Sequence, residues 1–227
     1  MAGFSETSFA ILAELEANNN KAWYDENKEK LKAEVRAPFA GMLGVVTMLL
    51  EGSRYPMIGS EKTMFRQYRD VRFSKDKTPY KSTVSGMITP NGSKGEGGGV
   101  VYAQVGPRGG MLAAGHYQLA TPELNRVRDR IVAEPESFAE MVEALEAKGY
   151  PLSREGSLKT MPRGFQQHGD AACAPFLRLK RYVTSVEQPK AVWLNGDIVE
   201  KMVHLAEAIG PLNAWVREAM IERAEAP

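Results

Sequence analysis

The sequence predicts an α+β fold in which helices and strands occupy separate parts of the chain. Apolar residues recur at helical spacing over residues 1–52 and again from residue 119 onward. Between them lie short runs rich in β-branched and aromatic residues, separated by glycine. Such segregation is typical of α+β domains. We therefore expect an antiparallel β-meander of three to five strands packed against N-terminal and C-terminal helices.

The first 52 residues predict two helices. The first begins after Ser5, and the asparagine triplet at 18–20 ends it and caps the next one. The second helix carries an apolar stripe from Tyr24 to Leu49. Pro38 should kink or divide this helix, because proline lacks a backbone donor and clashes with the preceding turn. Gly52 is expected to end it.

The middle of the chain predicts the meander. Its three strands are expected at Thr83–Thr89, Val100–Val105 and Met111–Tyr117, with glycine-rich loops between them. Residues 65–73 predict a fourth strand, in which Arg66, Asp70 and Arg72 would share one face. A short helix over the same residues is the alternative.

From residue 119 the chain is predicted to be mostly helical. Thr121-Pro122-Glu123 combines a capping hydroxyl, an early proline and an acid in the first turn, which together indicate a helix start. Further elements are expected at Pro135–Gly149 (helix), Arg181–Val186 (strand) and Asp197–Ala224 (helix, bent at Gly210-Pro211). We expect a single domain over 1–227, with N-terminal helices at 1–52, a basic segment and meander at 62–118 and a helical remainder at 119–227.

Composition is that of a soluble globular protein. The 227 residues are 43% hydrophobic and 25% charged, and the only cysteine, Cys173, has no internal partner for a disulfide. The N-terminus lacks the basic start and apolar run of a secretory signal. The most apolar stretch, Met42–Leu50, is far shorter than the roughly 20 residues of a membrane span. We expect a cytoplasmic protein that does not enter a membrane.

Positive charge is concentrated in residues 66–81. Six cations and two anions give this segment a charge of +4, whereas the whole chain carries +1, so the other residues sum to about −3. Arginine and lysine are the side chains that recognise phosphate and carboxylate groups. The segment is therefore a candidate site for an anion.

The candidate ligand-binding residues follow from this segment. The charged group would be held by Arg66, Arg69, Arg72, Lys75, Lys77 and Lys81, with Asp70, Ser74, Tyr80, His116 and Tyr117 as further members. Arg69 falls on the apolar face of the expected strand, where it must pair with a carboxylate, reach a ligand or extend to water. The structural alternative is an exposed cluster without a ligand, because two like charges ~6 Å apart in water repel by only ~0.7 kcal/mol.

The sequence assigns no catalytic residue, cofactor or metal. The three histidines, His116, His168 and His204, are widely separated and lack zinc-ligand spacing. Ser74 lacks the Gly-x-Ser-x-Gly context of an activated nucleophile. Asp70 and Asp76 could serve as acid and base or hold magnesium, but ion pairs with the neighbouring arginines are the simpler interpretation.

A family resemblance centres on the same segment. Arg-Asp-Val-Arg-Phe-Ser-Lys-Asp-Lys-Thr-Pro-Tyr-Lys at 69–81 resembles the signature of the uncharacterised domain-of-unknown-function family 2461. Residues 4–28, 102–117 and 158–165 match it in order, and the resemblance as a whole covers about 4–185. It implies a functional patch at the motif, but it supplies no reaction.

Three functions remain open at this stage. The first is binding of a small phosphate- or carboxylate-bearing molecule, possibly as an enzyme. The second is a nucleic-acid or protein binding module, in which the loops at 91–99 and 106–110 extend the basic surface through Lys94 and Arg108. The third is a structural or interaction domain using the helix at 197–224. The slightly acidic remainder of the chain favours the small anion over nucleic acid, and the oligomeric state is left open.

Overall fold

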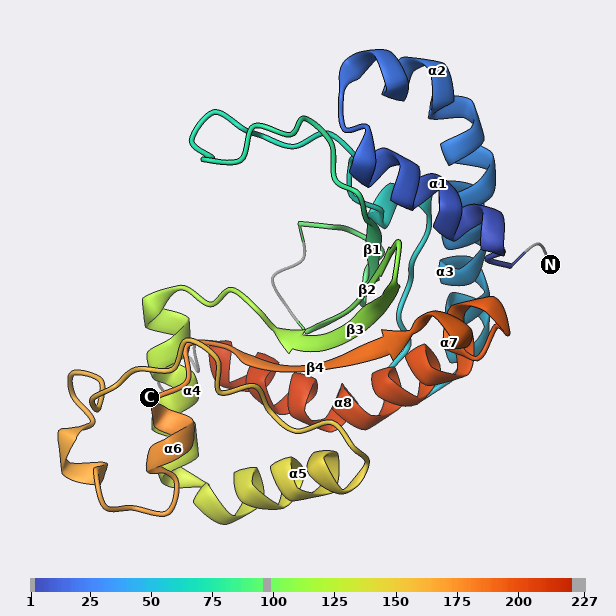
Figure 1. Cartoon of the computed structure of the whole chain (residues 1–227). Coiled ribbons are helices and arrows are strands. Elements are labelled where there is room, and N and C mark those ends of the chain that lie inside the picture. The colour runs from blue at the N-terminus through green and yellow to red at the C-terminus, as the bar shows by residue number, and fades with distance from the viewer. Residues whose placement is uncertain (1–2, 96–98, 222–227) are drawn as a thin grey trace. The chain divides into compact units, whose positions relative to one another are not determined.

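The computed structural model describes residues 3–95 and 99–221 and has the α+β composition that the sequence predicts (Figure 1). The helices are α1 (Glu6–Ala17), α2 (Lys21–Leu31), α3 (Ala37–Leu50), α4 (Thr121–Ala133), α5 (Pro135–Ala147), α6 (Ala174–Leu177), α7 (Lys190–Leu194) and α8 (Ile198–Met220). The strands are β1 (Val84–Ile88), β2 (Val100–Gly106), β3 (Gly109–His116) and β4 (Tyr182–Pro189).

The four strands form one sheet in the order β1-β2-β3-β4. β1 and β2 are antiparallel, with Ser85 opposite Gln104. The predicted meander is therefore confirmed, and the strand expected at Arg181–Val186 is β4. The strand predicted at 65–73 is wrong: these residues are all described, and they contribute only an isolated bridge, from Tyr68 to Tyr80. The segment turns back to pair with residues 79–81 instead of extending the sheet.

Residue contacts divide the chain into two compact units, each built from several stretches. The first comprises Met1–Glu96, Val101–Leu112 and Val186–His204, and the second comprises Gly97–Val100, Ala113–Ser185 and Leu205–Pro227. Strands β2, β3 and β4 and helix α8 contribute residues to both units. The assignment of residues 1–227 to a single domain stays a prediction.

Local signals near the N-terminus act as predicted. The Ser5 side chain accepts from the Ser8 N–H and caps α1, and the Asn20 side chain accepts from the Trp23 N–H and caps α2. In the core of the first unit, the Phe4 ring packs edge-on against Trp193 at 5.2 Å. Gly86 of β1 gives the close approach to α3 that this core needs, because a Cβ there would lie 3.0 Å from the Phe39 ring.

Helices α2 and α3 are joined by a π-helical turn, η1 (Lys32–Arg36), directly before Pro38. The proline thus marks a change of helical type within one continuous stretch, Lys21–Leu50. By length and composition alone, this 30-residue stretch could cross a membrane. That is weak evidence, since the core helix of a soluble protein passes the same test, and Leu31, Val35 and Phe39 are fully buried here.

The second unit has its own core, in which Phe138 packs against Tyr182 and Trp215 with ring centroids 5.9 and 5.1 Å apart. The N-cap of α4 is Ala120 and not Thr121; the Glu123 carboxylate accepts from the Ala120 N–H at 2.7 Å. Pro211 lies inside α8, which continues to Met220. The predicted continuation to Ala224 falls on 222–227, outside the described residues.

Candidate functional site

Residues 66–81, called the basic arm below, form an irregular hairpin that projects away from β1 (Figure 1, teal). Its two sides pair through the backbone: the Arg69 N–H donates to the Pro79 carbonyl at 2.9 Å, and the Lys81 N–H donates to the Gln67 carbonyl at 2.8 Å. Gln67 is buried, and its side-chain amide also donates to the carbonyls of Lys81 and Thr83. The arm is therefore a paired structure and not a loose loop.

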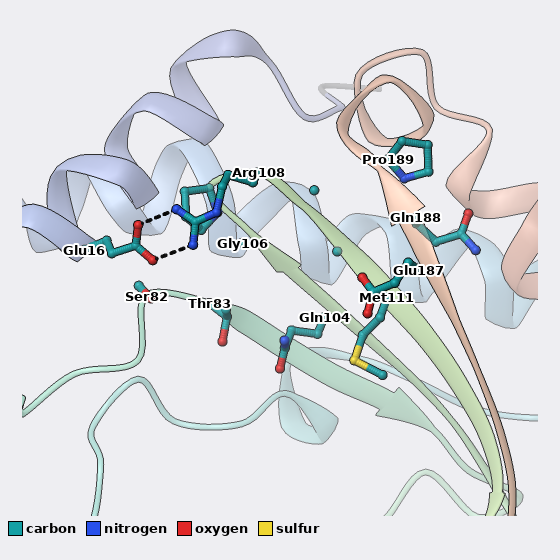
Figure 2. A pocket seen from close by; sticks show the side chains of 13 residues that line it. Glu16, Ser82, Thr83, Gln104, Gly106, Arg108, Met111, Glu187, Gln188 and Pro189 are labelled. Carbon is teal, nitrogen blue, oxygen red and sulfur yellow. Dashed lines mark hydrogen bonds and ion pairs between the residues drawn. The ribbon is translucent and has the colours of Figure 1, made fainter. Parts of the chain in front are cut away.

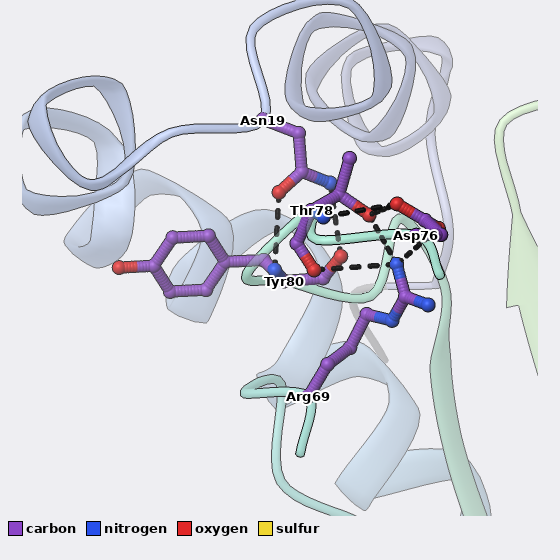
Figure 3. Close-up of polar contacts among 5 residues, drawn as sticks. All are labelled: Asn19, Arg69, Asp76, Thr78 and Tyr80. Atoms are coloured by element: carbon purple, nitrogen blue, oxygen red, sulfur yellow. Dashed lines mark hydrogen bonds and ion pairs between the residues drawn. The ribbon is translucent and has the colours of Figure 1, made fainter. Parts of the chain in front are cut away.

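The base of the arm is fixed to the junction between α1 and α2. The Asn19 side chain donates to the Tyr80 carbonyl at 2.9 Å and accepts from the Tyr80 N–H at 3.0 Å (Figure 3). The Tyr24 ring of α2 stacks on the Tyr80 ring at 3.9 Å, and Tyr68 packs against both. Tyr80, a candidate ligand residue, is thus a buried anchor of the arm.

Farther out, Arg69 is engaged within the arm. Its guanidinium binds the Asp76 carboxylate and the Thr78 hydroxyl (Figure 3). The Thr78 N–H donates to Asp76 at 2.9 Å, and this hydrogen bond with the Arg69 contact lowers the pKa of Asp76 to about 2. Of the three outcomes expected for Arg69, the chain adopts pairing with a carboxylate.

Arg72 is also paired with its neighbour. It makes a bidentate contact with Asp70, Nε at 2.9 Å and Nη2 at 2.7 Å from the carboxylate oxygens, and this contact lowers the pKa of Asp70. The interpretation of Asp70 and Asp76 as ion-pair partners agrees with these contacts. Neither Arg69 nor Arg72 therefore presents a free guanidinium to a shared anion.

The remaining candidates at the tip face water. The Lys77 ammonium donates to the Val71 carbonyl at 2.9 Å, and Lys75 is exposed. The Ser74 N–H closes a turn onto the Val71 carbonyl at 3.3 Å. The tip is thus a turn held by hydrogen bonds to the Val71 carbonyl.

The base of the arm differs, because its cations form no ion pair among the described residues, although the charge of Arg66 contributes to the lowered pKa of Asp70. The Lys81 ammonium is half-buried and lies 5.6 Å from the centre of the Phe65 ring, and its pKa is lowered by burial and by the nearby charge of Arg66. Arg36 donates to the Phe65 carbonyl at 3.2 Å, and Lys94 donates to the Met64 carbonyl at 2.9 Å. Over the residues that the structure describes, no ion pair neutralises these four cations.

A hollow of about 470 Å³ begins immediately after Lys81 in the chain (Figure 2). It is lined by Glu16, Ser82, Thr83, Gln104, Gly106, Pro107, Arg108, Gly109, Gly110, Met111, Glu187, Gln188 and Pro189, all of the first unit. Side chains from the residue before β1 and from β2, β3 and β4 follow one another across its floor. Figure 2 shows this row as Thr83, Gln104, Met111 and Glu187.

Two ends of the hollow carry charge. At one end Arg108 makes a bidentate ion pair with Glu16, at 2.7 and 3.0 Å, which lowers the pKa of the Glu16 carboxyl. Arg108 was expected to extend the basic surface from a loop tip; this ion pair largely neutralises it. At the other end Glu187 is exposed. The carboxylates leave the hollow itself slightly negative.

An aromatic wall connects the cations of the arm base with the hollow. The Phe65 ring contacts both the Lys81 ammonium and the Tyr102 ring, whose centroid is 6.0 Å away. The Tyr102 hydroxyl donates to the Gln104 side-chain oxygen at 2.8 Å, which leaves the amide nitrogen of Gln104 as a donor toward the floor. Lys81, Phe65, Tyr102 and Gln104 thus form one connected series.

His116 and Tyr117 belong to the second unit and have their own partners there. The His116 ring is buried; its Nδ1 accepts from the Gly99 N–H at 3.3 Å, and its Nε2 lies 3.2 Å from the Asn213 carbonyl. Burial lowers the pKa of His116 to about 4, so the ring is neutral near pH 7. The Arg181 guanidinium lies over the Tyr117 ring at 5.1 Å. These contacts make His116 a satisfied core histidine.

A family model described as "Conserved hypothetical protein (DUF2461)" matches residues 7–215. The chain belongs to this family. The resemblance drawn from the motif at 69–81 is thereby confirmed, and the match covers most of the chain. No protein among the curated sequences matches it. The description of DUF2461 names no reaction, so membership in the family does not assign one to this chain.

For this DUF2461 chain, the sequence located the arm but missed the hollow. Glu16, Gln104 and Glu187 come from distant segments and share no motif. The one usable signal was the alternation of half-buried polar residues in β2, where Tyr102 and Gln104 share a face. Among the described residues, no group of three or more histidine, cysteine, aspartate or glutamate side chains is placed to hold a metal ion.

Proposed function

We propose that this protein binds a small molecule carrying a phosphate or carboxylate group, with the anionic group at Arg66 and Lys81 and the rest of the molecule in the adjoining hollow. The observation that carries the proposal is the half-buried ammonium of Lys81, which lies close to a second cation and has no ion-pair partner among the described residues. The proposal concerns binding and assigns no reaction.

Electrostatics support this position for the anion. Burial and a neighbouring like charge both disfavour the charged form of Lys81, as the lowered pKa reflects. An anion between Lys81 and Arg66 would turn this repulsion into two attractions. Charge-assisted hydrogen bonds to arginine and lysine are also among the stronger polar contacts in proteins. Binding should therefore raise the pKa of Lys81.

The hollow supports a ligand with a polar, uncharged body. Thr83 and Gln104 offer hydrogen bonds, and Met111 offers an adaptable apolar surface. The carboxylate of Glu187 would repel a second anionic group, so the charged end of the ligand should lie toward the arm base. The Phe65 and Tyr102 rings would form the wall between the two parts of the site.

The tip of the arm is less suited to this role. Arg69 and Arg72 already share their charge with Asp76 and Asp70. Lys75 and Lys77 are exposed, and exposed charges bind a small anion weakly because water and salt screen them. Arg66 is exposed as well, but unlike the tip lysines it lies close to the half-buried Lys81. The tip therefore supplies the control for the test.

The test is isothermal titration calorimetry of the full chain with inorganic phosphate, pyrophosphate and a nucleoside monophosphate. Lys81→Met and Arg66→Gln should each weaken binding about tenfold or more, which corresponds to at least ~1.4 kcal/mol. Lys75→Met removes the same charge from the same arm and should leave binding within about twofold. Equal losses in Lys81→Met and Lys75→Met, or no binding of any probe by the wild type, would contradict the proposal.

The titration also separates the small-anion proposal from nucleic-acid binding. A single-stranded oligonucleotide would engage the whole arm, so its affinity would fall steeply with salt and would depend on Lys75 as much as on Lys81. Site-specific phosphate binding instead depends mainly on the two cations at the arm base.

A further inference from the structure

Phe73, at the tip of the basic arm, is the most exposed large apolar side chain among the described residues, with 96% of its surface in water. The ring therefore contributes almost nothing to the free energy of folding, because folding removes so little of its surface from water. The Arg72 guanidinium lies 5.9 Å from the ring centre and is itself held by Asp70. The fold thus presents an aromatic ring to solvent beside a fixed cation.

The contacts of the arm hold the backbone turn that carries this ring. At the base, Asn19 fixes Tyr80 through two hydrogen bonds. Along the arm, Asp76 binds both Arg69 and Thr78. At the tip, the Lys77 ammonium donates to the Val71 carbonyl and closes the turn that carries Phe73. A series of polar contacts therefore runs from the junction between α1 and α2 to the turn that carries an almost fully exposed ring, as expected of a preorganised binding element.

We propose that Phe73 is an anchor for a partner protein, inserted into an apolar pocket whose rim carries carboxylates. Aromatic and arginine side chains supply much of the energy at protein interfaces, and a rigid ring loses little entropy on docking. Residues 69–78 carry four cations and two anions, which is complementary to an acidic rim. Lys75, which is exposed, is the cation placed to meet it, whereas the Lys77 ammonium holds the Val71 carbonyl.

The charge distribution favours a protein over a nucleic acid as the partner. Outside residues 66–81 the chain carries about −3, so the tip has no broad basic surface to follow a phosphate backbone. A single exposed ring beside the Arg72 guanidinium, with Lys75 two residues farther along the chain, instead fits a localised contact with a pocket. This interaction is separate from the small-anion site, because it uses the tip of the arm and leaves Arg66 and Lys81 aside.

The probe for this inference is a phage-displayed random peptide library, selected on the immobilised full chain and counter-selected on Phe73→Ser. We expect the retained peptides to combine aspartate or glutamate with large apolar residues. A synthetic copy of the strongest peptide, measured by fluorescence anisotropy, should lose at least about tenfold in affinity with Phe73→Ser and about threefold or more with Lys75→Glu. Leu49→Ser, which changes another exposed apolar residue, and Lys81→Met should leave the affinity unchanged.

Because Phe73 is exposed, Phe73→Ser should melt at the wild-type temperature, so a loss of binding is not a loss of folding. The inference is overturned if no peptide depends on Phe73, or if Phe73→Ser binds the selected peptide as the wild type does. It is also overturned if a single-stranded oligonucleotide, and no peptide, requires Phe73. Failure of phosphate binding in Lys81→Met has no bearing on this result.

Discussion

The side chain of Asn19 pairs with the backbone of Tyr80 as a neighbouring strand would, donating to its carbonyl at 2.9 Å and accepting from its N–H at 3.0 Å. One side chain thus satisfies both backbone groups of a buried residue across 61 positions of sequence. This contact joins the first helices to the basic arm, and it decides where the arm base lies.

Removing this pair should destabilise the first unit. Asn19→Ala leaves the Tyr80 N–H and carbonyl without these partners, and each lost hydrogen bond to a buried group costs about 1 kcal/mol. We expect a loss of about 2 kcal/mol in the free energy of unfolding by urea. Asn18→Ala is the control, because Asn18 makes one exposed contact to the Glu14 carbonyl. Equal losses in the two variants would contradict the role given to Asn19.

Most of the fold prediction rested on short-range sequence signals, such as helix caps and glycine-rich turns. Ser5 and the asparagines at 18–20 set helix boundaries through hydrogen bonds within a few residues, so the sequence alone displays them. The glycine-separated runs at 83–117 predicted the meander for the same reason. The strand predicted at 65–73 failed because alternation shows only that a segment is extended. It does not show whether the segment pairs with the sheet or, as here, with residues 79–81.

The buried ring of His116 predicts a pH-dependent stability. Its pKa is about 4 in the folded chain, against about 6.5 unfolded, so the unfolded state binds the proton more readily. This stability is fully present above pH 6.5 and is lost as the pH falls toward 4, by up to about 3 kcal/mol.

Urea unfolding at pH 7 and pH 4.5 checks this effect. His116→Gln should be less stable at pH 7 and should lose less stability on acidification than the wild type. His168→Gln, which changes a half-buried histidine away from the Gly99 and Asn213 contacts, is the control. An unchanged pH dependence in His116→Gln would show that other groups cause the loss.

Arg128 should be a structural cation of the second unit. Its buried guanidinium donates to the Leu177 carbonyl at 2.8 Å and to the Leu179 carbonyl at 3.0 Å. Arg128→Met would leave both carbonyls unsatisfied and should lower the free energy of unfolding by about 3 kcal/mol. Arg128→Lys should recover only part of this, because one ammonium lacks the fork geometry. Thermal unfolding of these variants beside the exposed Arg163→Ala is the measurement, and a small effect of Arg128→Met would contradict the assignment.

Two glycines should respond to alanine in opposite directions. At Gly110 in the hollow, a Cβ would lie 2.0 Å from the Gln104 carbonyl oxygen, so Gly110→Ala should destabilise the first unit by about 2 kcal/mol or more. At Gly44 inside α3, nothing lies within 4 Å of a Cβ. Gly44→Ala should therefore stabilise by about 0.5–1 kcal/mol, through helix propensity alone. Chemical denaturation distinguishes the two, and a neutral Gly110→Ala would show that β2 and β3 are not so closely paired.

The candidate site was only partly accessible from sequence. The charge excess at 66–81 is a property of one short segment, so it can be recognised from the sequence alone. Which cations remain unpaired depends on the fold, since Arg69 and Arg72 find their carboxylates within the arm while Lys81 meets Phe65. The hollow brings Glu16, Gln104 and Glu187 together through the fold and the order of the strands. That order cannot be predicted from the sequence of any single segment.

The most direct test of the small-anion site is a crystal of the full chain soaked in sodium tungstate, whose anomalous scattering locates a tetrahedral oxyanion without ambiguity. We expect a peak within hydrogen-bonding reach of both the Lys81 ammonium and the Arg66 guanidinium, at the edge of the hollow. A peak bound only by Lys75 and Lys77, or a Lys81 ammonium already paired with a carboxylate, would contradict the proposed function.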